Sequence, residues 1–201
     1  PALPASCIQG LISVLYKNKG DRDDPRNYRP ITLLNCDYKI LTKILVKRMN
    51  HAVLEFVSPQ QNGFVPGGFL PDNIMLLQLI QAYVDENDME GMMVFLDMEK
   101  AFDRVSFTFI RKALQAVGFG PEFIKSISAM YNEDNPPNRR IYANGYYSDS
   151  FPIVSGVAQG CPLSPLLFLL VGEALRTALS LAKSVKGIRV GSVTEFIAQF
   201  A

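Results

Sequence analysis

The sequence has no tryptophan, a single histidine and only three cysteines, Cys7, Cys36 and Cys161, among its 201 residues. The cysteines are odd in number, lie far apart and show no C-x-x-C spacing. Neither a disulfide framework nor a structural zinc site is therefore expected, and the pattern is typical of free thiols in a reducing compartment.

Long hydrophobic runs are also lacking. The longest uninterrupted apolar run extends from Leu166 to Val171, between Pro165 and Gly172. A membrane-spanning helix needs about 20 apolar residues, so we expect no membrane span. The first four residues contain no methionine and do not read as a signal peptide, which indicates a segment of a longer protein.

The composition is that of a globular protein, with 48% hydrophobic and 19% charged residues. The net charge is only +1, but it is spread unevenly along the chain. Residues 1–50 carry nine Lys or Arg against four acidic residues, whereas residues 51–100 carry one against eight. The basic part could bind a polyanion and the acidic part could bind cations. The alternative is that the two parts form solvent-exposed faces of opposite charge with no ligand.

The first part of the chain predicts a hairpin followed by a helix. Strands are expected at 9–16 and 28–34, around a polar tip that bears Lys17 and Lys19. Residues 37–56 have helical periodicity, with an apolar stripe and a basic stripe of Lys39, Lys43 and Lys47. The basic stripe is either a solvated face or a set of phosphate contacts.

The remaining segments alternate between helical and extended patterns. Residues 58–71 read as a Gly/Pro-rich loop. Helices are expected at about 72–86, 106–117, after Pro121 and at 164–182, and strands at 92–96, 139–144, 151–154 and 195–201. The apolar positions of 72–86 and 92–96 are expected in the core. These elements predict an α+β domain.

Asp97 directly follows the expected buried strand at 92–96. An acid in this place is costly unless it is paired, hydrogen-bonded or bound to a cation. Mg²⁺ takes one or two protein carboxylates and completes its shell with water and substrate phosphates. Asp97 is therefore a candidate metal ligand, and a turn-capping role is the alternative.

A second candidate site is the loop 159–165, QGCPLSP. Gly160 allows a ligand to approach the backbone closely, and the loop leads to a helix N-terminus, where amides favour anions. Ser164 and Pro165 fit the N-cap and first helical position. An ordinary entry into a helix is the alternative interpretation.

Six segments in a fixed order carry a more specific signal: 27–34 (NYRPITLL), 38–41 (YKIL), 61–67 (QNGFVPG), 72–74 (DNI), 96–105 (LDMEKAFDRV) and 156–165 (GVAQGCPLSP). In these segments, over nearly its whole length, the chain resembles the reverse transcriptase domain of non-LTR (LINE-type) retrotransposons. A group II intron maturase is a weaker alternative, because the residues at 100–103 (KAFD) and 160–165 (GCPLSP) match the LINE type better.

The resemblance implies a right-hand polymerase fold. Residues 1–90 would be mainly fingers and residues 91–201 mainly palm, with fingers elements possible in both parts. The family's Asp-Asp motif follows an aromatic residue and an alanine, and we expect Gln199-Phe200-Ala201 to be its start. The acids themselves and the thumb are then absent from this chain.

The resemblance also assigns roles to individual residues. Asp97 matches the first metal-binding aspartate, and Phe102 the aromatic residue that excludes a ribose 2′-hydroxyl. Gln159 and Gly160 match the loop against the incoming nucleotide and template base. Lastly, Arg29 matches the arginine of the fingers that grips the triphosphate, with Lys17 or Lys19 as its lysine partner. Asp103 belongs to the same signature but is not expected to bind metal.

The implied activity is RNA-directed DNA synthesis, in which a primer is extended on an RNA template with dNTPs by two-metal phosphoryl transfer. Its cofactor would be two Mg²⁺ ions and its partners template RNA, primer DNA and dNTPs, in the nucleus and cytoplasm and without a membrane. Two metal ions need carboxylate ligands on both sides, and Asp97 supplies only one side. The isolated chain is therefore expected to be inactive. A non-catalytic remnant that at most binds nucleic acid is the alternative.

Three positions depart from the family pattern. Ser155 stands where Arg is usual, Ala158 where Arg or Lys is usual, and Gly67-Gly68 where Gly-Arg is usual. Each change removes a positive charge from a segment expected to face template or primer. Each lost phosphate contact should lower the salt dependence of binding by about 0.7–0.9 in log–log slope.

Overall fold

The computed structural model describes residues 3–184, 186–190 and 193–195. It is a mixed α+β structure, as the sequence predicts. The elements follow the order α1 (Ala5–Ile8), β1 (Gly10–Tyr16), η1 (Pro25–Asn27), β2 (Tyr28–Leu34), α2 (Cys36–Phe56), α3 (Leu70–Glu86), η2 (Ala101–Arg104), α4 (Phe107–Ala116), α5 (Pro121–Ser128), β3 (Asn138–Ala143), β4 (Tyr146–Tyr147), β5 (Phe151–Pro152), α6 (Ser164–Leu181), β6 (Ile188–Val190) and β7 (Val193–Glu195).

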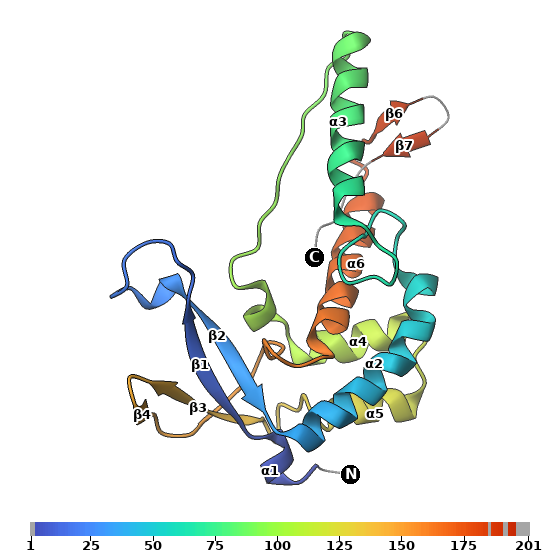
Figure 1. The fold of residues 1–201 in the computed structure, drawn as a ribbon. Helices are drawn as coiled ribbons and strands as arrows, with labels where there is room; N and C mark the ends of the chain where they lie inside the picture. The colour runs from blue at the N-terminus through green and yellow to red at the C-terminus, as the bar shows by residue number, and fades with distance from the viewer. Residues whose placement is uncertain (1–2, 185, 191–192, 196–201) are drawn as a thin grey trace.

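A mixed sheet lies to one side of the helices (Figure 1). Its strand order is β2-β1-β3-β4, and β5 pairs with β3. The predicted hairpin is confirmed: β1 and β2 are antiparallel, with a register that extends from Gly10 opposite Leu34 to Tyr16 opposite Tyr28. β1 is parallel to β3, so a strand from late in the chain joins the N-terminal hairpin in one sheet.

The turn between β3 and β4 is tighter than the sequence predicted. We expected a loop of more than two residues between strands 139–144 and 151–154. Instead, Asn144 and Gly145 form a two-residue turn, with φ of 52° and 86°, and Tyr142 pairs with Tyr147. Positive φ at both central residues gives a turn whose twist matches that of the flanking strands. The return strand β5 is shorter than predicted and covers 151–152.

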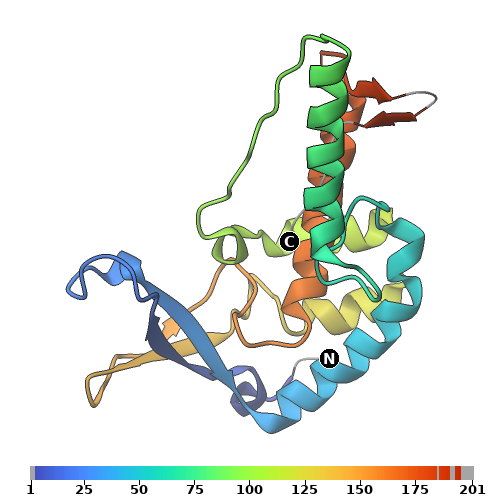
Figure 2. The same cartoon turned by 45° about the horizontal axis from the view of Figure 1, so that its top comes forward.

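The core lies mainly among α2, α4, α5 and α6, whose arrangement Figure 2 shows, and it extends to Leu34 at the end of β2 and to α1. α6 contributes a continuous buried run, and α2 contributes Leu45, Met49 and Val53 from its apolar stripe. Each fully buried leucine stabilises the fold by about 1.5–3 kcal/mol relative to an exposed one. Ser106 caps α4, since its Oγ accepts a hydrogen bond from the Phe109 N–H at 3.3 Å.

Two details of α6 differ from the sequence expectation. Leu163, rather than Ser164, is the N-cap residue, and the Ser164 Oγ donates to the Ala158 carbonyl at 2.8 Å. Among the described helices, α6 is long and apolar enough to cross a membrane by length and composition alone. The first half of α6 is packed in the core of the described structure.

The expected core role of residues 72–86 and 92–96 is wrong for this structure. α3 forms as predicted, but Met75 and Leu79 on its apolar stripe are exposed. Residues 92–96 form no strand and lie in an extended segment with Met92 85% and Phe95 77% exposed. A strand needs partners for its backbone amides and carbonyls, and no described strand pairs with this segment. Figure 1 shows it standing apart from α3.

The predicted last strand, 195–201, lies outside the described residues except for Glu195, which ends β7. The expected motif start, Gln199-Phe200-Ala201, lies wholly outside them.

Candidate active site

Two of the signature segments are joined by backbone hydrogen bonds. The Val157 N–H donates to the Phe102 carbonyl at 2.7 Å, and the Gly156 N–H donates to the Val105 carbonyl at 2.7 Å. Gly156 has a φ of +90°, and a Cβ there would lie 2.8 Å from the Cα of Asp103. The close approach of the two segments therefore requires glycine at this position.

The same loop is joined to the N-terminal hairpin. The Thr32 N–H donates to the Gln159 carbonyl at 2.6 Å. Gly160 has a φ of +117°, and a Cβ there would lie 2.5 Å from the Thr32 carbonyl oxygen. The structure shows that Gly160 permits close approach of β2. Its approach to a ligand stays a prediction.

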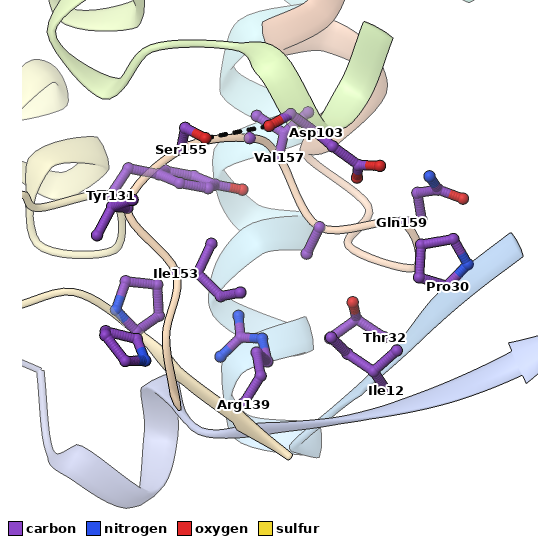
Figure 3. A pocket seen from close by; sticks show the side chains of 15 residues that line it. Ile12, Pro30, Thr32, Asp103, Tyr131, Arg139, Ile153, Ser155, Val157 and Gln159 are labelled. Carbon is purple, nitrogen blue, oxygen red and sulfur yellow. Dashed lines mark hydrogen bonds between the residues drawn. The ribbon is translucent and has the colours of Figure 1, made fainter. Parts of the chain in front are cut away.

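A cleft of about 360 Å³ lies between this loop and the sheet (Figure 3). Ile12, Pro30 and Thr32 of the hairpin line one side, and residues 152–159 line the other. Asp103, Tyr131, Pro137 and Arg139 complete the lining. The walls are therefore mostly apolar, with one acidic and one basic side chain among them.

Arg139 is the cation of this cleft and is only 5% exposed. Its Nη1 donates to the Ile8 carbonyl at 2.5 Å and to the Asn138 carbonyl at 2.8 Å. Burial lowers the pKa of Arg139 from its ordinary value. Sequence reasoning did not single out Arg139, although strand alternation in the pair Arg139-Arg140 places one of the two on the inner face.

A buried polar group lies beneath the cleft. The Tyr131 hydroxyl donates to the Sγ of Cys161 at 3.9 Å. Burial raises the pKa of Tyr38 and of Tyr131 well above the ordinary value for tyrosine, so both are neutral near pH 7. These groups therefore add no negative charge opposite Arg139.

Asp97 is exposed at the end of the extended segment and does not line the cleft. Two residues later, Glu99 pairs with Arg104 at 3.8 Å. Within the described part of the chain, no group of three or more His, Cys, Asp or Glu side chains is placed to hold a metal ion. One carboxylate fits a Mg²⁺ ion that takes its other ligands from water and phosphate, but it does not hold two ions.

Phe102 lies in η2 and is half-buried. Its ring stacks on that of Phe168 of α6, with centroids 4.8 Å apart and an interplanar angle of 18°. Beside this pair, a second hollow of about 460 Å³ is lined by Met98, Glu99 and Phe168, among others. Phe102 is thus held firmly by the core, next to an open volume.

The two basic candidates of the hairpin lie apart from the cleft. Lys17 is exposed, and its Nζ donates to the Arg26 carbonyl at 2.8 Å. Arg29 is also exposed. Because side chains alternate along a strand, Arg29 lies on the opposite face of β2 from Pro30 and Thr32, which line the cleft. Gln159 does line the cleft, whereas Gly160 contacts β2.

Comparison with known proteins gives the family. A family model described as "Reverse transcriptase (RNA-dependent DNA polymerase)" matches residues 16–193. The chain is 35% identical over 171 residues to the transposon TX1 uncharacterized 149 kDa protein of Xenopus laevis, covering 85% of this chain and 13% of that protein. It is 30% identical over 177 residues to the Pol polyprotein of the type-2 retrotransposable element R2DM of Drosophila melanogaster, covering 88% and 16%.

A third relative is the probable RNA-directed DNA polymerase from transposon BS of Drosophila melanogaster, 31% identical over 82% of this chain and 18% of that protein. The chain thus spans less than a fifth of the length of these relatives. The signature segments that meet around the cleft all lie within the matched region. The chain belongs to the reverse transcriptase family and is related to the polymerases of non-LTR retrotransposons such as R2, jockey and TX1.

Proposed function

We propose that this chain is the fingers and incomplete palm of an RNA-directed DNA polymerase, which extends a primer on an RNA template with dNTPs. The observation that carries the proposal is the junction of three signature segments. Backbone hydrogen bonds join 102–105 to 156–157 and Gln159 to Thr32. The parts that the family uses around a nucleotide are thus held together by the chain's own backbone.

In this proposal, residues 1–90 are mainly fingers and residues 91–201 mainly palm. Asp97 binds Mg²⁺, which, when bound, stabilises charge on the attacking and leaving oxygens of the transferred phosphoryl group. The stacking of Phe102 on Phe168 holds its ring rigidly, which suits a steric wall against a 2′-hydroxyl. Gln159 and Gly160 contact the nucleotide and template, and Lys17 and Arg29 contact the triphosphate.

The isolated chain is proposed to be inactive in polymerisation. Two divalent ions about 3.5–4 Å apart need carboxylates on both sides. Asp97 is exposed and belongs to no cluster of acidic ligands within the described residues. The same observation favours the second candidate function, a non-catalytic remnant that at most binds nucleic acid.

Primer extension in a fused protein tests the proposal. The chain is joined to the segment that follows the matched region in the TX1 protein, and templated extension with Mg²⁺ is measured. We expect extension by the fused protein, none by the 201-residue chain, and none by the fused Asp97→Asn variant. Asp88→Asn is the matched control, because Asp88 is an exposed aspartate of the turn after α3, where asparagine tolerates the positive φ of 48°.

Extension at more than a few per cent of the unsubstituted level by Asp97→Asn would refute the role of this residue. A folded fused protein that binds RNA without extending a primer would favour the remnant. Robust extension by the 201-residue chain would refute its proposed inactivity.

A further inference from the structure

Arg139 is a buried cation without an acidic partner in the described structure. None of the ion pairs among the described residues includes it, and its recorded hydrogen bonds are those of Nη1 to two carbonyl oxygens. Removal of a charged group from water costs several kcal/mol unless it is compensated. Two neutral acceptors on one nitrogen compensate only part of that cost for a guanidinium with five N–H donors.

The rest of the guanidinium faces the cleft. Figure 3 shows Arg139 rising from the sheet into the cavity, between Ile153 and Thr32. Every fully buried side-chain nitrogen or oxygen of the described residues has a hydrogen-bond partner, so the Arg139 donors without one keep some exposed surface, and Arg139 itself lines the cleft. A ligand in the cleft would therefore meet N–H donors of Arg139.

The other charged group of the cleft is Asp103. Figure 3 places it at the opposite side of the cavity from Arg139, beside Ser155, whose Oγ donates to the Asp103 carbonyl at 3.1 Å. No ion pair joins Asp103 to Arg139 within 4.0 Å. Tyr38 and Tyr131 lie near the guanidinium, and burial raises the pKa of both tyrosines well above the ordinary value, so neither hydroxyl is a negative partner near pH 7.

We propose that this cleft is a phosphate-binding subsite in which Arg139 pairs with one phosphate group of a nucleotide. The planar guanidinium matches phosphate oxygens in a two-pronged geometry and stays charged when it is desolvated. The apolar walls of Pro30, Ile153 and Val154 suit the uncharged part of the ligand. A cleft of about 360 Å³ lies within the usual range of small-molecule sites.

The choice of phosphate rests on the proposed function, which brings nucleotides to this part of the chain. The subsite itself is independent of the proposed metal position, because Asp97 does not line the cleft. The phosphate has two possible sources: a phosphodiester of an RNA strand, or the triphosphate of a free nucleotide.

Binding to the whole 201-residue chain tests the subsite without any catalytic step. One arm measures binding of a fluorescent eight-nucleotide oligouridine by anisotropy, and the other measures dTTP binding by calorimetry. We expect the Arg139→Met substitution to weaken the binding of the probe that occupies the cleft at least tenfold. For the RNA probe, the log–log salt slope should also fall by about 0.7, as for one lost phosphate contact on a single strand.

Arg140→Met is the matched control. Arg140 is the next residue of β3, loses the same charge, is exposed and lies on the other face of the sheet. Its substitution should leave cleft binding within twofold. Equal weakening by the two variants, or no saturable binding of either probe to the unsubstituted chain, would overturn the subsite.

Asp103→Asn keeps the test decisive should Arg139→Met fail to fold. Removal of the one negative charge that lines the cleft should tighten probe binding by about threefold, as expected for partial relief of like-charge repulsion. Unchanged or weaker binding by a folded Asp103→Asn chain would overturn the proposal. Probe binding without extension by the fused protein would refute only the polymerase function, and extension without probe binding would refute only the subsite.

Discussion

Substitution of Gly160 by alanine should separate the loop 156–165 from the hairpin. The new Cβ would lie 2.5 Å from the Thr32 carbonyl oxygen, a backbone atom that moves only if β2 moves. The φ of +117° adds strain, since residues other than glycine in such conformations cost about 1–3 kcal/mol. The 2.6 Å hydrogen bond from the Thr32 N–H to the Gln159 carbonyl would be lost, at about 0.5–1.5 kcal/mol.

Strain and the lost hydrogen bond should together lower stability by about 0.5–4 kcal/mol, after an offset of about 0.4–1 kcal/mol from the reduced freedom of the unfolded chain, and the steric contact with β2 adds to this loss. Gly118→Ala is the matched control. Gly118 also has a positive φ, +89°, but a Cβ there meets nothing within 4 Å. Its substitution should therefore cost about 1 kcal/mol, the strain alone. The difference between the two variants isolates the contact with β2.

Urea denaturation of both variants, followed by far-UV circular dichroism, measures these free energies. Gly160→Ala should unfold at a clearly lower urea concentration than Gly118→Ala, with an unchanged dependence on urea. If the two variants lose the same stability, the contact between the loop and β2 contributes nothing, and the structural basis of the proposed site is wrong.

Three further substitutions test other contacts. Phe102→Val in the fused protein should lower the ratio of kcat/KM for dNTP over rNTP, and an unchanged ratio would leave Phe102 with packing on Phe168 as its only role. Glu173→Gln should lower the free energy of unfolding by about 1–3 kcal/mol, because this buried carboxylate accepts hydrogen bonds from the Ser58 N–H and Arg176 Nε. The exposed pair of Glu122 with Lys125 is its control, where Glu122→Gln should cost less than about 1 kcal/mol. Finally, Ser155→Arg should steepen the salt dependence of RNA binding by about 0.7, whereas Ser180→Arg on α6 should leave it unchanged.

Local patterns predicted the regular elements well. The hairpin of β1 and β2 and the helices α2, α4 and α6 follow their sequence signals to within one or two residues. Each has its own local cause: alternation for the strands, a 3.6-residue period for α2, and Ser106 as the cap of α4. Motifs also located the segments 97–105 and 156–165, because their residue types and order are specific to a family.

The cleft could not be predicted in the same way, because it depends on contacts between distant parts of the chain. The parallel pairing of β1 with β3 brings Arg139 beneath the loop of Gln159, and neither segment contains a signal for the other. A glycine in a loop indicates only that some group approaches its backbone closely. The sequence does not reveal that the Thr32 carbonyl is one such group, because that contact depends on the fold.

Residues 92–96 show most clearly that a local sequence pattern does not determine burial or strand pairing. An apolar run that ends at an acid is typical of a buried strand, yet burial is a property of the surroundings and not of the run. Strand backbone must find hydrogen-bond partners on neighbouring strands, and the described sheets offer none at this place. Met92 and Phe95 are therefore exposed together with Asp97. The position of the proposed metal ligand thus depends on a pairing that these five residues cannot make by themselves, which is why the fused protein, rather than the isolated chain, is the proper test of Asp97.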